Sequence, residues 1–299
     1  MKMIEPFDVT PARVLESTVP ITETEWTAGT YETGTQRYVG AELYEVVATP
    51  STDTEPLAGA ELDPPAWLRV GAINRFAAFD GLLGRPSEVA SGVMSWRIHG
   101  AGLVNGVALF GLVGETATVR IRRQSDDEVV LERSWRLLGR GVPTTFWEWA
   151  FLPFEETDTA LVTDGPSLID PIVEIEVDGG ASRAALGEAF LGKIQRLGVT
   201  LYGTSVEVED FTRRERDPFG NFVIVGRPST RIVRYTVSVR NSELSRVDKL
   251  LRARLARPTV YIGDEGFPTT VLPGFPRNIQ SVPLGPTVSE MLFEVEGLI

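Results

Sequence analysis

The chain has 299 residues, of which 42% are hydrophobic and 23% charged, and its formal net charge is -12. This composition is typical of a soluble globular protein, and the length predicts two or three domains. Without cysteine, disulfides, thiolate nucleophiles and cysteine metal sites are excluded. The N-terminus reaches Glu5 and Pro6 before any apolar run, so we expect neither a signal peptide nor membrane insertion.

The first predicted element is an aromatic-rich segment, WTAGTYETGTQRYVGAELYEVV, at residues 26–47. Its rings belong to Trp26, Tyr31, Tyr38 and Tyr44. Rings at such spacings either stack on sugars or form the core of a very small domain. A polar, proline-bearing stretch at 49–65 closes the segment and is predicted to be a loop or linker. We therefore predict a small aromatic-rich β module within residues 1–70.

Residues 71–199 are predicted to form a β-sandwich, because short β-branched runs recur there between glycines and prolines. One aromatic and acidic stretch, FWEWAFLPFEETD at 146–158, stands out. Its tryptophans, Trp147 and Trp149, are candidate glycan contacts. Glu148, Glu155 and Glu156 are the acids that a glycoside hydrolase would need beside them. Exposed solubilising acids on a sandwich with tryptophans in its core are the alternative, and we expect these acids to be non-catalytic.

The sequence offers little else for catalysis. His99 is the only histidine, and in its strand-like context we expect it to be a structural hydrogen-bonding residue. The chain has no G-x-S-x-G nucleophile motif and no glycine-rich phosphate loop. One histidine without cysteine cannot build a zinc site. We therefore predict no enzyme, no catalytic residue, no metal and no cofactor.

Residues 200–299 are predicted to form a β-rich domain with one helix. In TRIVRYTVSVR at 230–240, alternation places Val233, Tyr235, Val237 and Val239 on one buried face. A helix is predicted near 242–257, with Asn241 or Ser242 as its N-cap. The apolar face of this helix would carry Leu244, Val247, Leu251 and Leu255.

A basic block lies between residues 211 and 257, where twelve Arg and Lys face four acids. The block carries +8 and the rest of the chain -20, a division that favours docking onto a partner or between copies. Eleven of the twelve bases are arginine, which grips carboxylates with two hydrogen bonds. The candidate assembly contacts are Arg213, Arg214, Arg231 and Arg234. A solvated strand face is the alternative, and without a nucleic-acid motif we expect no nucleic-acid partner.

Two motifs together resemble a known family. EWTAGTYETGTQRYVGAELYEVVAT at 25–49, followed by AWLRVGAINRFAAFD at 66–80, is similar to a pattern in tail-tip and baseplate proteins of tailed bacteriophages. The first motif is also similar to small chitin-binding-type carbohydrate modules. VNGVALFGLVG at 104–114 extends the resemblance to a galactose-binding-like jelly roll. The resemblance spans roughly residues 25–299.

The resemblance implies a virion component of the tail tip, made in the host cytoplasm, that serves host attachment. Its partners would be other tail-tip or baseplate proteins, copies of itself, and cell-surface polysaccharide. In chitin-binding modules the tyrosines are mainly core, and exposed aromatics directly after the second one hold the sugar. Here Tyr44 is followed by EVVATPS, so Tyr31 and Tyr44 are predicted to be core, and Trp26 and Trp67 become the candidate glycan contacts. A purely structural tail adaptor and a carbohydrate-binding accessory module or glycan hydrolase remain alternatives.

Overall fold

The computed structural model describes residues 1–48, 50–140, 145–147, 154–216 and 222–298. The chain is mainly β, with 52% strand and 10% helix, which confirms the predicted class. It divides into two compact units. We name Phe7–Ala189 the N-terminal unit, and Met1–Pro6 together with Phe190–Ile299 the C-terminal unit. The predicted three-part division, at 70 and at 199, stays a prediction.

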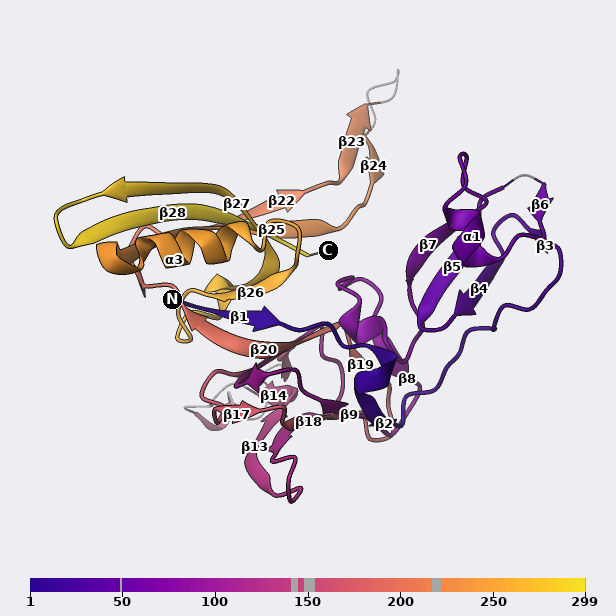
Figure 1. The fold of residues 1–299 in the computed structure, drawn as a ribbon, viewed down its shortest axis with the longest axis horizontal. Helices are drawn as coiled ribbons and strands as arrows, with labels where there is room; N and C mark the ends of the chain where they lie inside the picture. The colour runs from indigo at the N-terminus through magenta and orange to yellow at the C-terminus, as the bar shows by residue number, and fades with distance from the viewer. Residues whose placement is uncertain (49, 141–144, 148–153, 217–221, 299) are drawn as a thin grey trace. The chain divides into compact units, whose positions relative to one another are not determined.

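The C-terminal unit is built on one curled antiparallel sheet (Figure 1). Its strands, in spatial order, are β20 (Glu188–Arg196), β1 (Lys2–Pro6), β26 (Thr259–Ile262), β27 (Val271–Pro283), β28 (Val288–Gly297) and β25 (Ser229–Arg240), and then β21 (Val199–Thr200) and β22 (Ser205–Asp210), both paired with β25. The first strand of the chain therefore lies in the interior of the sheet, between β20 and β26.

Helix α3 (Asn241–Arg252) covers one face of the sheet and packs against β25, β27 and β28. The face of β25 that alternation predicted is the buried one: Val233, Tyr235, Val237 and Val239 are each at most 2% exposed. They join Val247 and Leu251 of the helix in one hydrophobic cluster. Three aromatic rings pack together in this core. The ring centroids of Tyr235 and Tyr261 lie 5.4 and 5.8 Å from that of Phe293.

The helix is shorter than predicted. Arg240 occupies the N-cap position, without a side-chain capping hydrogen bond, in place of Asn241 or Ser242. The helix ends at Arg252. Beyond that point the chain tightens into three-residue turns, with the amides of Arg254 and Leu255 bonded three residues back. Leu255, predicted for the buried face, is 52% exposed. The side chain of Arg254 turns instead to an ion pair with Glu5 of β1.

The N-terminal unit contains a five-stranded antiparallel sheet. Its order is β13 (Val129–Arg136), β12 (Thr116–Arg122), β18 (Ile172–Asp178), β9 (Val93–His99) and β2 (Val14–Ser17). The short strand pairs of this unit are β11 (Gly106–Phe110) with β16 (Thr159–Val162), β8 (Ser87–Val89) with β19 (Ala184–Leu186), β10 (Leu103–Val104) with β17 (Leu168–Ile169), and β14 (Leu138–Arg140) with β15 (Phe154–Glu156). Single 3-10 turns lie at Pro11–Arg13 and Ala77–Phe79. The jelly-roll assignment stays a prediction.

The aromatic-rich segment folds as a small module within the N-terminal unit. Its strands are β3 (Tyr31–Glu32) paired with β6 (Ser51–Thr52), and a sheet of β4 (Gln36–Val39), β5 (Glu42–Val46) and β7 (Trp67–Ala72). The stretch 49–65, predicted as a loop or linker, contains the short helix α1 (Pro56–Ala60). This helix contacts β7 and β4, so the stretch is part of the module and not merely a connection.

Candidate functional site

The rings of the small module form a miniature core. Tyr44 and Trp67 are 5% and 0% exposed and form one cluster with Val46 and Ala66. Half-buried Trp26 and Tyr31 pack against this cluster. The predicted core role is therefore confirmed for Tyr44, Tyr31 is half-buried at the edge of this core, and Trp67, a candidate glycan contact, is fully buried.

Trp67 is buried because helix α1 lies over it. Gly59 of α1 approaches so closely that a β-carbon there would lie 2.5 Å from Cδ1 of the indole. The indole N–H donates to the carbonyl of Thr54 at 2.7 Å. Neither ring face of Trp67 is therefore available to a sugar.

The remaining two rings are also engaged within the module. The ring of Tyr31 meets Trp67 edge to face at 5.7 Å, and its hydroxyl donates to the carbonyl of Thr27 at 2.7 Å. The guanidinium of Arg37 stacks over Tyr31, 5.0 Å from the ring centroid. The indole nitrogen of Trp26 is buried and has no hydrogen-bond partner among the described residues. Trp67 and Tyr44 thus form the centre of the module, with Tyr31 and Trp26 half-buried against it, and a sugar contact of Trp26 stays a prediction.

The second motif, GAINRFAAFD at 71–80, joins the small module to the rest of the N-terminal unit. Asn74 is 6% exposed and its amide group donates to the carbonyls of Pro20 and Glu88, at 3.0 and 2.9 Å. The side-chain oxygen of Asn74 accepts a hydrogen bond from the backbone N–H of Glu88. The backbone N–H of Asn74 donates to the carboxylate of Glu23. Asn74 of this motif is therefore a joint that ties three segments of the N-terminal unit together by hydrogen bonds.

A pair of carboxyl groups lies in the same joint. Asp80 accepts hydrogen bonds from the amides of Ala72 and Leu82, both at 2.9 Å. Glu188 is 3% exposed and accepts from the amide of Gly81 at 3.1 Å. Burial, and second the charge of Asp80, raise the pKa of Glu188 well above its ordinary value, and burial also raises the pKa of Asp80. No residue of the predicted site set lies here, and no motif or spacing in the sequence indicates this buried pair.

A groove of about 290 Å³ opens beside the joint. Its charged and polar lining comes from Glu23, Asn74, Arg85, Glu88 and Arg183. These groups are occupied by one another or by the backbone, since Arg183 pairs with Glu88 at 2.7 Å and Arg85 donates to the carbonyl of Val70 at 2.8 Å. The lining includes no aromatic side chain, so the groove lacks the stacking surface that a sugar site uses.

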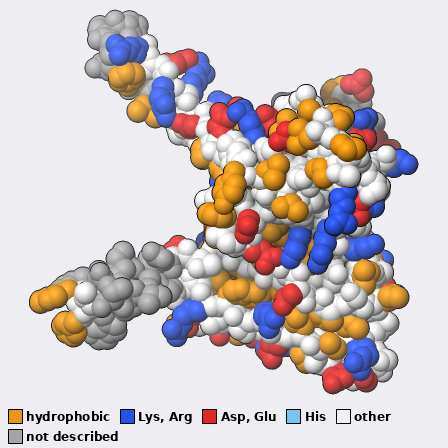
Figure 2. All heavy atoms as spheres, turned by 90° about the vertical axis from the view of Figure 1, so that its left-hand side faces the viewer, with side chains coloured by type: hydrophobic (Ala, Val, Ile, Leu, Met, Phe, Trp, Pro, Cys, Tyr) orange, Lys and Arg blue, Asp and Glu red, His pale blue; other side chains and the backbone are white. Residues whose placement is uncertain are grey.

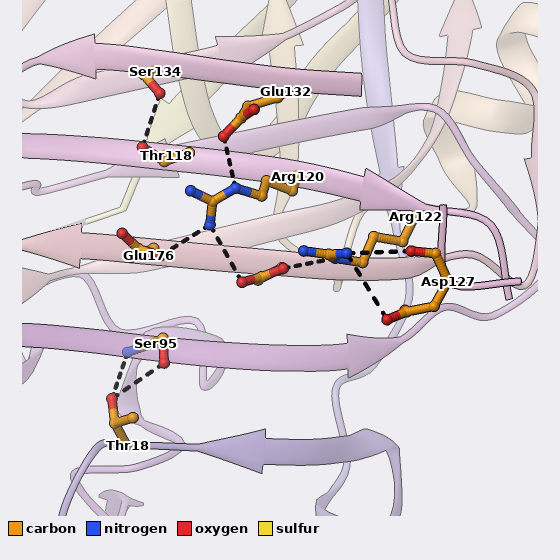
Figure 3. A network of polar contacts seen from close by, with 10 residues as sticks. Thr18, Ser95, Thr118, Arg120, Arg122, Asp127, Glu132, Ser134 and Glu176 are labelled. Carbon is orange, nitrogen blue, oxygen red and sulfur yellow. Dashed lines mark hydrogen bonds and ion pairs between the residues drawn. The ribbon is translucent and has the colours of Figure 1, made fainter. Parts of the chain in front are cut away.

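The five-stranded sheet carries a ladder of ion pairs (Figure 3). Arg120 pairs with Glu132, Glu176 and Glu174, and Arg122 with Glu174. Apart from exposed Glu132, these charges are half-buried, and they come from neighbouring strands and neutralise one another. His99, on the same sheet, lies 2.8 Å from the side-chain nitrogen of Gln124. The charges of the ladder are therefore engaged with one another on this face of the sheet.

The acidic and aromatic stretch at 146–158 is described only in part. Trp147 is 70% exposed, as is Phe146, and the two rings meet edge to face at 6.1 Å. Glu156 is exposed. Trp149 and Glu148 lie outside the described residues, as does the side chain of Glu155. Among the described candidates for glycan contact, Trp147 presents its ring to solvent.

The four candidate arginines differ in their partners. Arg213 pairs with Glu215 and Arg214 with Asp210, each at 2.5 Å. Arg234 lies between Glu294 and Glu207, at 2.8 and 3.0 Å. Arg231 is exposed and makes no ion pair within the described part of the chain. Figure 2 shows basic and acidic side chains mingled over the face that it presents. Within the candidate set, Arg231 therefore has the charge most available to a partner.

An exposed part of the basic block is a hairpin whose first strand carries two of the candidate arginines, Arg213 and Arg214. Strands β23 (Arg213–Arg216) and β24 (Phe222–Val225) pair only with each other and extend from β22 and β25 (Figure 1). We name these two strands the arm. Phe222, Ile224 and Val225 are 62%, 65% and 48% exposed. The signal in the sequence was an apolar run, FVIV, following a wholly charged one, RRER.

Comparison of the chain with family models, with curated proteins and with solved structures gives no match. Among the described residues, no group of three or more His, Asp or Glu side chains could hold a metal ion. None of the described helices has the length and apolar character needed to cross a bilayer.

Proposed function

We propose that this chain is a structural virion component of a phage tail tip or baseplate, binding other tail proteins and copies of itself through its C-terminal unit. One observation carries the proposal: the arm leaves large apolar side chains uncovered beside arginines. Exposed apolar surface rimmed by charge is typical of protein interfaces. Arginine and aromatic side chains are also the residues most enriched among interface anchors.

The charge of the two units supports the same role. The C-terminal unit has 16 basic and 13 acidic residues, a net charge of +3. The N-terminal unit has 13 basic and 28 acidic residues, a net charge of -15. Opposite fields on one chain speed association and fix its orientation. Such a protein works by buried area and charge complementarity and needs no cofactor.

Co-sedimentation with partner tail proteins tests this role. We expect the purified chain to sediment with tail fractions and Arg231→Glu to stay in the supernatant while keeping its wild-type circular dichroism. Arg257→Glu is the matched control, because it makes the same charge change at another exposed arginine. A wild-type chain that sediments with no tail fraction would overturn the proposal. Normal incorporation of folded Arg231→Glu would place the docking surface elsewhere.

Glycan binding is a second candidate function, supported by the exposed pair Phe146 and Trp147. Exposed aromatic rings stack on sugar faces. Retention on cell-surface polysaccharide should then fall in Trp147→Ala, while Phe222→Ala, which removes a similarly exposed ring elsewhere, retains it. Absence of polysaccharide binding on a glycan array would favour a purely structural tail adaptor. Release of reducing ends from polysaccharide would instead favour the hydrolase.

A further inference from the structure

The arm has two unlike faces. Opposed residues of an antiparallel pair share a face, and faces alternate along each strand. Arg214 opposes Ile224 and Arg216 opposes Phe222, so these four side chains form one face, which we name the arm face. It contains two cations, two large apolar groups and no acid. The opposite face carries the ion pair of Arg213 with Glu215.

Within the described residues, the arm face is not covered by any other element. The guanidinium of Arg216 lies over the ring of Phe222 at 4.6 Å, and no described carboxylate pairs with it. An isolated two-stranded hairpin is marginally stable in water. Figure 2 shows hydrophobic and basic side chains next to each other along the projecting arm. A surface of this kind is completed by a partner that supplies apolar side chains and carboxylates.

A segment of this same chain has that complementary chemistry. Residues 55–63 read EPLAGAELD and run from the start of α1 into the loop after it. Leu57 and Leu62 are 52% and 50% exposed. Three exposed acids flank them, Glu55, Glu61 and Asp63, and none makes an ion pair with a described residue. We name residues 55–63 the acidic leucine segment.

The whole small module strengthens this match. Residues 24–72 contain eight acids and two bases, a net charge of -6. Of these charges, Glu42 and Arg69 neutralise each other in an ion pair. The module therefore presents a negative field around two exposed leucines, while the arm face presents arginines around exposed Phe222 and Ile224.

We propose that the arm face of one copy docks on the acidic leucine segment of a second copy, so that copies associate head to tail. The apolar side chains supply the buried area, and Arg216, which no described carboxylate pairs with, meets the carboxylates that surround the leucines. Arg214, in its ion pair with Asp210, lies beside this contact. Because the two surfaces differ, the contact is heterologous, and repetition of it gives a ring or a filament. This inference rests on the assembly role proposed above and names the partner surface.

Two one-sided variants test the pairing. Arg216→Glu with Phe222→Asp removes the arm face, and Glu61→Arg with Leu62→Asp removes the acidic leucine segment. All four positions are exposed, so both variants should keep the wild-type circular dichroism. Each variant alone should be monomeric by sedimentation velocity, with self-association weakened about tenfold or more, as loss of interface anchors does. Mixed together, the two variants should form a one-to-one dimer, because each supplies the half that the other lacks.

Matched controls lie outside the two proposed surfaces. Val225→Asp changes the far face of the arm, and Leu68→Asp changes an exposed leucine of β7; both should associate like the wild type. Self-association of the wild type should also weaken when salt is added, because the electrostatic screening length falls from about 8 Å at 0.15 M to about 3 Å at 1 M.

Three outcomes would overturn the inference: a wild-type chain that stays monomeric at every concentration, one-sided variants that still self-associate, or a mixture that remains monomeric. The purified chain is used alone, so this result is independent of co-sedimentation with tail proteins. A chain that associates head to tail but never joins a tail would refute the tail assignment and retain the contact.

Discussion

The small module and the arm are both small β structures with large apolar side chains, and they treat those side chains in opposite ways. In the module, Trp67 and Tyr44 are 0% and 5% exposed beneath a helix. In the arm, Phe222 and Ile224 are 62% and 65% exposed on strands with no further layer. The rings of the module left two interpretations open, a stacking surface or a core, and Tyr44 and Trp67 form a core, whereas the exposed large rings and aliphatic groups of the arm are uncovered. Aromatic content therefore says less about recognition than the presence of a covering element.

The largest expected effect tests whether the rings of the module are its core. Tyr44→Ala should lower the free energy of unfolding by roughly 3 to 5 kcal/mol, as large-to-small core changes do, and should unfold the module. Thermal denaturation and proteolysis measure this loss. Tyr38→Ala is the control, since Tyr38 is half-buried and lies outside the cluster. Wild-type stability in Tyr44→Ala, with sugar binding lost, would restore the stacking platform.

A second test addresses the covering element. Gly59→Ala places a methyl group 2.5 Å from the indole of Trp67 and should cost about 1 to 3 kcal/mol, as overpacking does. Gly29→Ala is the matched control, because a β-carbon there meets nothing within 4 Å. Chemical denaturation of both variants gives the comparison. Equal stability of the two would mean that α1 does not press on Trp67.

A third test concerns the anchorage of the module, where Glu188 lies buried beside Asp80. The folded-state pKa of Glu188 is raised. The contribution of protonated Glu188 to the free energy of unfolding is therefore fully present below the unfolded pKa of about 4.3. That stability is lost as pH rises through the folded pKa. Glu188→Gln removes the ionisation, so its melting temperature should exceed the wild type at pH 7.5 and match it near pH 4. An equal difference at both pH values, or exposed Glu61→Gln behaving likewise, would contradict the burial effect.

The smallest expected effect concerns the arm. Ile224→Ser should change the free energy of unfolding by no more than about 0.5 kcal/mol, because an exposed side chain loses no packing. Self-association should nevertheless weaken. Calorimetry and sedimentation of one preparation separate the two quantities. A large loss of stability would mean that the arm is packed in the monomer, and the contrast with the module would disappear.

The sequence predicted those features that depend on local periodicity. Alternation along β25 identified the buried face of Val233 and Tyr235, and helical spacing located α3. The end of α3 was missed because Leu255 continues the apolar spacing although the chain has already left the helix. Periodicity records which side chains are apolar, and it does not record where backbone hydrogen bonding changes.

The candidate site was predicted less well because its properties depend on pairing between distant segments. Trp67 opens a strand whose next residue, Leu68, is 53% exposed, and only the position of Gly59 decides which of the two is covered. Arg234 lost its role as an unpaired cation because the strand register places Glu294 directly opposite it. Neither the register nor the covering helix can be read from spacing within one segment.

The strand Lys2–Pro6 lies between β20 and β26, where Lys2 is opposite Arg196 on one side and Ile262 on the other. Both pairings join residues that are far apart in the sequence, so each must close a long loop before its hydrogen bonds form. Contacts of this kind slow folding relative to local hairpins. We therefore expect the sheet of the C-terminal unit to be completed only after local pairs such as β27 with β28 have formed.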